Sequence, residues 1–157
     1  GSENYAPTLE KIIQTTTSDK LKRYAKQSLS LISEYEEKNK LLSNTTNIDP
    51  SLSPEINKYI HMLRSDNLTL KTDAAKSIYR NHFSEKKLFD ILRDELLKGY
   101  KLTSSTDRNY TDTMAWMCKA LGSSGMAEYK QTLTEIIENS SSLKLQKYAK
   151  QSLGMLQ

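Results

Sequence analysis

Two segments of this 157-residue chain, Tyr5–Ile32 and Tyr129–Leu156, are copies of one another, 124 positions apart. They match at 14 of 28 positions, and the run Tyr-Ala-Lys-Gln-Ser-Leu is intact in both. A duplicated unit of this length predicts a fold that is built by stacking structural repeats. Folds of this kind mostly present binding surfaces rather than reaction centres, so the duplication bears on function as well.

Four segments share apolar residues at the spacing i, i+3, i+4, which places three side chains on one stripe of an α-helix. The triplets are Leu9, Ile12 and Ile13; Ile56, Tyr59 and Ile60; Leu88, Ile91 and Leu92; and Leu133, Ile136 and Ile137. We therefore expect a first helix, here called an A helix, within each of the segments 5–17, 53–66, 84–100 and 126–141.

A second pattern follows each triplet, with apolar or small residues at intervals of four. It consists of Leu21, Ala25 and Leu29; Leu70, Ala74 and Ile78; Thr113, Met117 and Leu121; and Leu145, Ala149 and Leu153. These residues predict B helices in the segments 18–32, 68–83, 107–122 and 142–157. The sequence thus predicts an all-α chain of four helical hairpins, each with an outer A helix and an inner B helix.

The breaks in the two patterns agree with this division. Ser18-Asp19, Ser53, Ser84 and Ser142 are residues that favour helix N-caps, and the run Gly122–Gly125 is suited to end the third B helix. The first B helix is expected to extend to about Leu42, before a polar connector at Ser43–Pro50. A second insertion, Gly99–Asp107, lengthens the third hairpin.

The repeats resemble those of the HEAT family of α-solenoids. The residues that carry the resemblance are the Leu-x-x-Ile-Ile stripe of the A helices, the Leu-x-x-x-Ala-x-x-x-Leu stripe of the B helices, and the endings Ala120-Leu121-Gly122 and Ser152-Leu153-Gly154. They cover the chain from about Tyr5 to Gln157, and Met117 in the usual alanine position is the main departure. The resemblance implies an α-α superhelix that binds proteins, with the B helices on its concave side.

Composition bounds the domain organisation. Gly1-Ser2 looks like a remnant of cloning, so residues 1–4 are assigned to a flexible N-terminus and residues 5–157 to one HEAT-like repeat domain. Five Gly and three Pro are few for a β-sandwich or barrel. No apolar run approaches the roughly 18 residues of a membrane span. No targeting signal is visible, and the compartment is left open, with the cytoplasm slightly favoured over the periplasm or secretion.

No constellation of catalytic or metal-binding residues stands out. His61 and His82 are the only histidines and lack metal-ligand spacing, so we interpret them as structural. Cys118 follows Trp116-Met117 within a helix, and we interpret it as a packed small hydrophobe. The acidic residues Asp90, Asp94 and Glu95 alternate with basic ones, which indicates an ion-paired surface. We expect no enzymatic activity, cofactor or metal.

Positive charge is concentrated in the B segments, which hold twelve Lys or Arg against four Asp, whereas the A segments hold eight basic and ten acidic residues. Lysines on exposed helices also serve solubility alone, so a basic groove for an acidic segment is one of two interpretations. The candidates for a basic stripe are Lys22, Arg23, Lys26, Lys71, Lys76, Arg80, Lys119, Lys144, Lys147 and Lys150.

Three aromatic residues, Tyr24, Trp116 and Tyr148, occupy one equivalent position in the B helices, and Asp73 takes that position in the second hairpin. Aromatic side chains beside lysines are typical anchors of binding faces. The same side chains also fill space between stacked repeats, and the sequence leaves both interpretations open.

The leading hypothesis is a non-catalytic scaffold or adaptor that holds a protein or acidic peptide on its inner helix layer. The alternative is a nucleic-acid-binding protein with a basic concave face, similar to the HEAT-like DNA glycosylases. A net charge of +4 and a single tryptophan speak against the alternative. A role as an accessory subunit that attaches a pigment has no support in particular residues. The sequence leaves the oligomeric state open.

Overall fold

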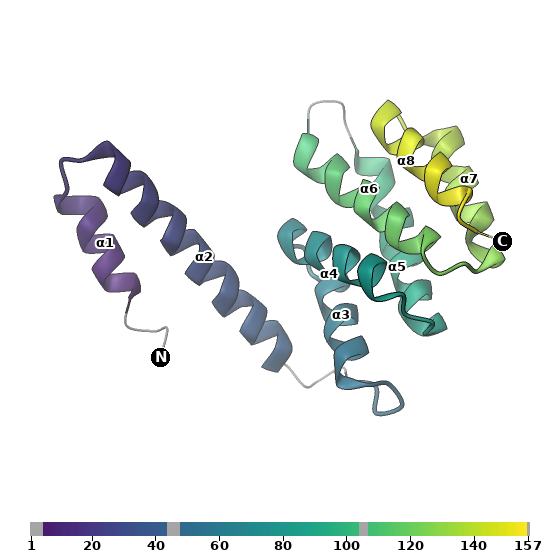
Figure 1. Ribbon diagram of the computed structural model, residues 1–157, viewed down its shortest axis with the longest axis horizontal. Coiled ribbons are helices and arrows are strands. Elements are labelled where there is room, and N and C mark those ends of the chain that lie inside the picture. The colour runs from purple at the N-terminus through teal and green to yellow at the C-terminus, as the bar shows by residue number, and fades with distance from the viewer. Residues whose placement is uncertain (1–4, 44–47, 104–106, 157) are drawn as a thin grey trace. The chain divides into compact units, whose positions relative to one another are not determined.

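The computed structural model describes residues 5–43, 48–103 and 107–156, and these ranges contain helices, turns and irregular segments but no β-strand (Figure 1). The all-α prediction is thereby confirmed for the described part of the chain. The predicted N-terminal remnant at 1–4 lies outside the described residues. The chain divides into two compact units, residues 1–47 and 48–157, and each is described by itself below. One domain over 5–157 stays a prediction.

The first unit is a pair of packed helices, α1 (Ala6–Thr15) and α2 (Asp19–Ser43). Pro7 lies in the first turn of α1, where its missing N–H costs no hydrogen bond. The hydroxyl of Ser18 accepts a bond of 3.4 Å from the amide of Leu21, close to the start of α2. The end of α2 at Ser43 confirms the extension that was predicted to reach about Leu42.

The second unit contains the other three hairpins. They are α3 (Pro54–Arg64) with α4 (Leu68–Asn81), α5 (Lys86–Gly99) with α6 (Arg108–Gly122), and α7 (Lys130–Asn139) with α8 (Leu143–Leu153). Short 3₁₀ turns, η2 (Tyr100–Leu102) and η3 (Ala127–Tyr129), follow α5 and precede α7. The predicted segments and the observed helices therefore agree, and the described part of the Gly99–Asp107 insertion holds η2.

The six helices of the second unit form two layers. The B helices α4, α6 and α8 pack on one another in sequence, and they lie nearest the viewer in Figure 1. The A helices α3, α5 and α7 make the other layer. Between the layers the stripe residues are buried, with Leu70 and Ile78 of α4, Met117 and Leu121 of α6, and Leu145 of α8 at most 3% exposed. Each such side chain contributes about 1.5–3 kcal/mol through burial.

Helix starts match the predicted caps with one exception. Ser53 accepts a bond from the amide of Ile56 at 3.2 Å, and Ser142 accepts one from the amide of Leu145 at 3.3 Å. Ser84 was predicted to cap the third A helix, but α5 takes Glu85 as its N-cap residue and Glu85 makes no side-chain capping bond. That part of the prediction is wrong, because Ser84 lies one residue too early.

One buried amide fixes the segment that leads into α3. Asn57 is 4% exposed. Its Nδ2 donates to the carbonyl of Asp49 at 2.9 Å and contacts those of Leu52 and Ser53 at 3.2 Å each, while its Oδ1 accepts from the amide of Asp49. Asp49 in turn forms an ion pair with Lys87 of α5, and that hydrogen bond holds the pKa of the Asp49 carboxyl below its usual range. The segment from residue 48 thus belongs structurally to the second unit.

Candidate functional site

Trp116, Lys119 and Tyr148 form a cluster on the layer of B helices. The ammonium of Lys119 lies 4.5 Å from the centroid of the Trp116 ring and 4.8 Å from that of the Tyr148 ring. Trp116 and Lys119 are one turn apart on α6, whereas Tyr148 belongs to α8. All three side chains are half-buried. The lysine is therefore held between two rings by cation–π attraction while the cluster remains open to solvent.

The neighbouring helix α4 extends this cluster. The ammonium of Lys76 lies 5.4 Å from the centroid of the Trp116 ring. The ring of Tyr79 meets Trp116 edge-on, with the centroids 6.2 Å apart and an interplanar angle of 67°, which is a favourable geometry for aromatic rings. Three helices thus contribute side chains to the surroundings of one tryptophan.

Two hollows flank Trp116, and both Trp116 and Asp112 line each of them. The hollow between α6 and α8 has a volume of about 150 Å³ and is also lined by Ala115, Lys119, Lys144 and Tyr148. The hollow between α4 and α6 has a volume of about 440 Å³ and is also lined by Leu68, Thr69, Thr72, Asp73, Lys76, Asn109 and Thr113. Trp116 therefore forms a ridge between two adjoining depressions.

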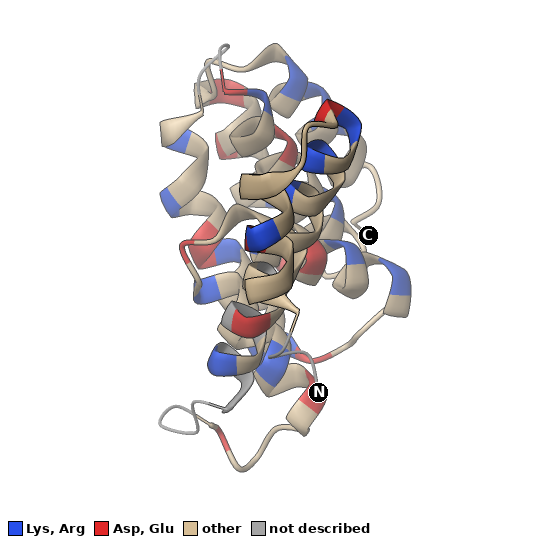
Figure 2. Cartoon of the chain, turned by 90° about the vertical axis from the view of Figure 1, so that its left-hand side faces the viewer, with Lys and Arg blue, Asp and Glu red and all other residues tan. Residues whose placement is uncertain are grey.

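Two polar bridges connect the helices beside these hollows. The carboxylate of Asp112 on α6 forms an ion pair with Lys144 on α8, and the hydroxyls of Thr72 and Thr113 are hydrogen-bonded at 2.8 Å between α4 and α6. Figure 2 shows basic and acidic residues interspersed along the helices. We call the following residues together the Trp116 surface: Lys76, Tyr79, Asp112, Trp116, Lys119, Lys144 and Tyr148.

The ten basic residues predicted to form one stripe have different surroundings. Lys76, Lys119 and Lys144 belong to the Trp116 surface. Lys71 does not, because its ammonium donates to the carbonyl of Leu63 at 2.6 Å and to Glu95 of α5 at 2.8 Å. Burial raises the pKa of the Glu95 carboxyl, but hydrogen bonds from Lys71 and Lys98 outweigh it, so the pKa is lowered. Lys71 therefore joins the two helix layers.

The remaining predicted residues are exposed, on α4 (Arg80), α8 (Lys147 and Lys150) and α2 (Lys22, Arg23 and Lys26). The third predicted anchor, Tyr24, also belongs to α2, and the guanidinium of Arg23 lies 5.8 Å from its ring centroid. Because α2 belongs to the first unit and α4, α6 and α8 belong to the second, the convergence of all these side chains on one face stays a prediction.

Two members of the Trp116 surface, Tyr79 and Asp112, were missed from the sequence. For Asp112 a signal existed, since Asp112 and Lys144 each stand four residues before an aromatic anchor, and that common spacing puts them opposite each other on adjacent helices. Tyr79 had no such signal, because the residues at the corresponding position of the other B helices are not aromatic.

Cys118 and the two histidines differ in their surroundings. Cys118 is fully buried, and burial raises the pKa of its thiol. His82 has a left-handed backbone, with φ 49°, and is the C-cap residue of α4. The Nε2 atom of His61 is buried and accepts or donates no hydrogen bond within the described residues. No group of His, Cys, Asp or Glu side chains in the described ranges has a geometry that would hold a metal ion.

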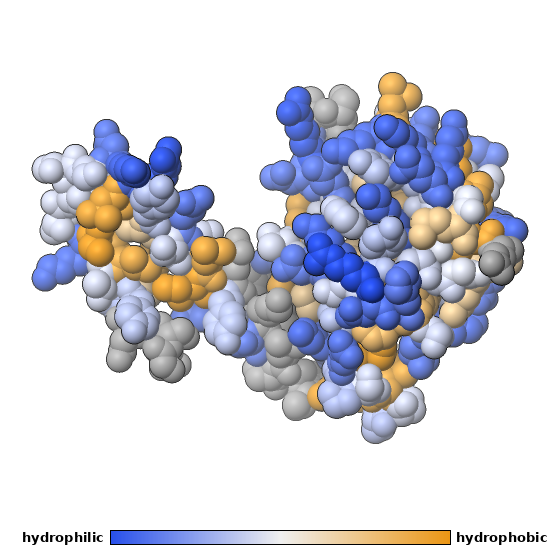
Figure 3. All heavy atoms as spheres, viewed as in Figure 1, coloured by the Kyte–Doolittle hydropathy of each residue, from blue (hydrophilic) through white to orange (hydrophobic). Residues whose placement is uncertain are grey.

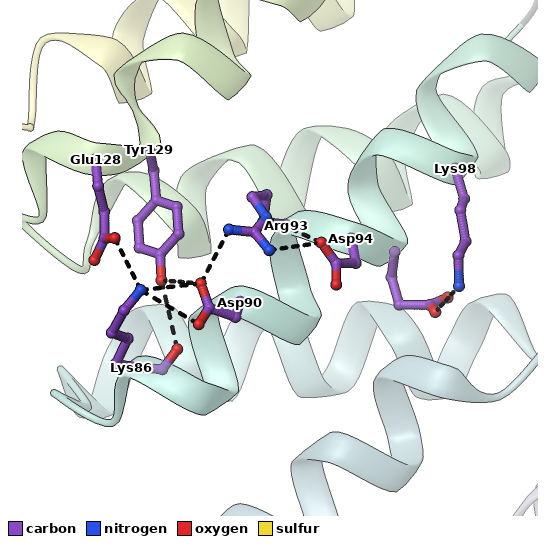
Figure 4. A network of polar contacts seen from close by, with 8 residues as sticks. Lys86, Asp90, Arg93, Asp94, Lys98, Glu128 and Tyr129 are labelled. Atoms are coloured by element: carbon purple, nitrogen blue, oxygen red, sulfur yellow. Dashed lines mark hydrogen bonds and ion pairs between the residues drawn. The ribbon is translucent and has the colours of Figure 1, made fainter.

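The acidic cluster on α5 belongs to an ion-paired network on the layer of A helices, shown in Figure 4. Lys86 bridges Asp90 and Glu128, and Arg93 bridges Asp90 and Asp94. The hydroxyl of Tyr129 donates to Asp90 at 3.1 Å, and burial together with this bond raises the pKa of Tyr129. The network joins α5 to η3 and confirms the predicted ion-paired surface.

The sequence and the structure were compared with known proteins, and no protein-family model, no curated protein and no solved structure matches the chain. Within the described residues no helix is both long enough and apolar enough to cross a membrane.

Proposed function

We propose that the chain is a non-catalytic scaffold that binds a segment of a partner protein on its Trp116 surface. A finer part of this proposal is that the three hairpins of residues 48–157 form a HEAT-like superhelical stack with α4, α6 and α8 on its concave side. Their division into two layers supports it.

The observation that carries the proposal is the position of Lys119 between the rings of Trp116 and Tyr148, beside two hollows. Tryptophan, tyrosine and basic residues dominate the energetics of protein interfaces when they are clustered and partly desolvated. A ridge between two depressions suits an extended segment that places one side chain in each hollow and crosses over Trp116.

The charges indicate what such a segment contains. Lys76 and Lys119 offer ammonium groups next to the aromatic ridge and favour a carboxylate in the ligand. Asp112 already neutralises Lys144, and Asp73 lines the larger hollow. This mixed pattern suits a protein segment with a few acidic residues better than the continuous phosphates of a nucleic acid, which require a row of uncompensated cations.

Trp116 is the only tryptophan of the chain, so its fluorescence reports on this surface alone. The test is a titration with short peptides that combine acidic and apolar residues, and in parallel with single-stranded and duplex oligonucleotides. We expect the peptides to quench or shift the emission, and Lys119→Gln and Tyr148→Ala to weaken binding at least tenfold. Lys130→Gln, on the exposed surface of α7, is the matched control.

Two results would oppose the proposal. Peptide binding that is equally strong in Lys119→Gln, Tyr148→Ala and the control would move the ligand to another surface. Oligonucleotide binding tighter than about 10⁻⁴ M, weakening steeply with salt and abolished by Lys119→Gln, would favour the nucleic-acid alternative instead.

A further inference from the structure

The α1–α2 hairpin repeats the face with which α7–α8 packs on α5–α6. In residues 129–156 ten side chains are buried: Tyr129, Thr132, Leu133, Ile136, Ser140, Ser142, Leu145, Ala149, Ser152 and Leu156. Eight of these ten are identical 124 positions earlier, and the other two are replaced by Thr16 and Ile32. Only six of the other eighteen positions in the segment are identical. Sequence identity between the two copies is therefore concentrated in the residues of the packing face.

In the first unit most of the same face is accessible to solvent, and Ala25 is the one buried residue among the ten counterparts. Tyr5 is 63% exposed and Leu21 is 49% exposed, whereas their counterparts Tyr129 and Leu145 are fully buried. Ser28 is likewise exposed, whereas its counterpart Ser152 is buried. Figure 3 shows a group of hydrophobic side chains at the surface of the α1–α2 hairpin. Exposed apolar groups of this kind mark interaction sites.

The packing of α7–α8 shows what this face fits. Ser152 lies against Gly122 of α6, where an added Cβ on the glycine would come within 2.8 Å of the Ser152 carbonyl oxygen. The hydroxyl of Tyr129 reaches the carboxylate of Asp90 at 3.1 Å. The face therefore fits the end of a helical hairpin that offers a glycine on its B helix and a carboxylate on its A helix.

The outer end of α7–α8 offers both features again. Gly154 is the C-cap residue of α8 and corresponds to Gly122 at the end of α6, as the shared Leu-Gly endings show. It is exposed, and a Cβ there would have no neighbour closer than 3.5 Å. Glu135 occupies the place in α7 that Asp90 occupies in α5, and its Oε1 accepts a hydrogen bond from the hydroxyl of Tyr100 at 2.8 Å. The adjoining Met155 is 41% exposed. An acceptor for the α1–α2 face is thus present on the chain itself.

The charges of α1 and α7 are close to balanced. Helix α7 carries Glu135 and Glu138 against Lys130, and α1 carries Glu10 and Lys11. One pair opposes the contact, because Lys20 would approach Lys144 where, within the chain, Lys144 meets Asp112. This pair provides a site at which one substitution is expected to strengthen the contact.

We propose that α1–α2 of one copy docks on the outer end of α7–α8 of a second copy, in the way that α7–α8 docks on α5–α6 within the chain. The contact is heterologous, so copies join head to tail and add without closing unless the rotation per copy permits a ring. This proposal is independent of the ligand of the Trp116 surface.

The test is sedimentation velocity of the full chain from about 5 to 300 µM. We expect the average mass to rise with concentration. Ser28→Arg places a large charged side chain on the docking face, and Gly154→Arg places one on the acceptor, and both positions are exposed, so both variants are expected to fold and to remain monomeric. Ser30→Arg, on the opposite side of α2, is the matched control and is expected to associate like the wild type.

Two further measurements make the assignment specific. A mixture of Ser28→Arg and Gly154→Arg retains one intact face of each kind, so it is expected to form dimers and nothing larger. Lys20→Glu replaces repulsion from Lys144 by attraction and is expected to tighten association about threefold or more, in line with the modest energies of exposed ion pairs.

A wild type and a Lys20→Glu variant that both remain monomeric at 300 µM would overturn the proposal. It would equally be overturned if Ser28→Arg and Gly154→Arg associated like the wild type, or if their mixture contained only monomers.

Discussion

Gly122 of α6 and Ser152 of α8 are in such close contact that a Cβ on the glycine would lie 2.9 Å from the serine Cβ. Gly122→Ala is therefore expected to destabilise the second unit by about 1–3 kcal/mol, because backbone and side chain must move apart. Urea unfolding followed by Trp116 fluorescence measures this. The control is Gly154→Ala at the equivalent, open position, which is expected to stay within about 0.5 kcal/mol of the wild type. Equal effects at the two glycines would contradict the packing described here.

Tyr129 and Tyr5 offer a comparison of one residue type in two surroundings. Removing the buried hydroxyl in Tyr129→Phe leaves Asp90 without one of its donors and is expected to cost about 1 kcal/mol. Tyr5→Phe removes a hydroxyl from a side chain that is 63% exposed and is expected to be neutral. Chemical denaturation of both variants provides the measurement, and a neutral Tyr129→Phe would show that the bond contributes nothing net.

Glu95 is expected to make part of the stability dependent on acid pH. Its pKa is lowered in the folded chain because the bonds from Lys71 and Lys98 outweigh the opposing effect of burial. A carboxyl with a depressed pKa stabilises the fold above its unfolded pKa of about 4.3, and this stability is lost as the pH falls through the folded pKa. In Glu95→Gln the free energy of unfolding should be lower at pH 7 and should fall less between pH 5 and pH 3. Glu138→Gln, on the exposed face of α7, is expected to follow the wild-type profile, and identical profiles for all three proteins would refute the assignment.

Cys118 is expected to react only when the second unit opens. The side chain is fully buried and burial raises the pKa of the thiol, so both access and thiolate are lacking in the folded state. A water-soluble disulfide reagent at pH 8 should modify it slowly in buffer and completely in denaturing urea. Gly122→Ala should accelerate the reaction about tenfold for each 1.4 kcal/mol of lost stability. Rapid modification of the wild type in buffer would be inconsistent with the structure.

The helices could be predicted closely because each hairpin shows both periodicities and usable end signals. The intervals of four in Leu145, Ala149 and Leu153 place α8 without further information, and Ser142 marks its start. Ser84 misled because two polar residues precede α5, and local sequence does not determine which of them takes the cap position.

The candidate site was predictable only where the repeats align. Trp116 and Tyr148 occupy equivalent positions, so their nearness on adjacent helices follows from stacking. The bond between Lys71 and Glu95 joins residues 24 positions apart on helices of different layers. The periodicity within a single helix does not predict such a bond. The number of charges in a segment therefore does not distinguish a lysine that faces a partner from one, such as Lys71, that stabilises the fold.

The two copies of the repeat share residue types on the packing face but differ in the burial of most of those residues. Between the two copies, eight of the ten positions of the packing face are identical, against six of the other eighteen. Polar residues would be tolerated at Tyr5 and Leu21 if this face contacted nothing, because both side chains are exposed. Tyr5 and Leu21 keep the residue types of the packing face although they are exposed, which is the pattern expected of a hairpin that makes the contact proposed above.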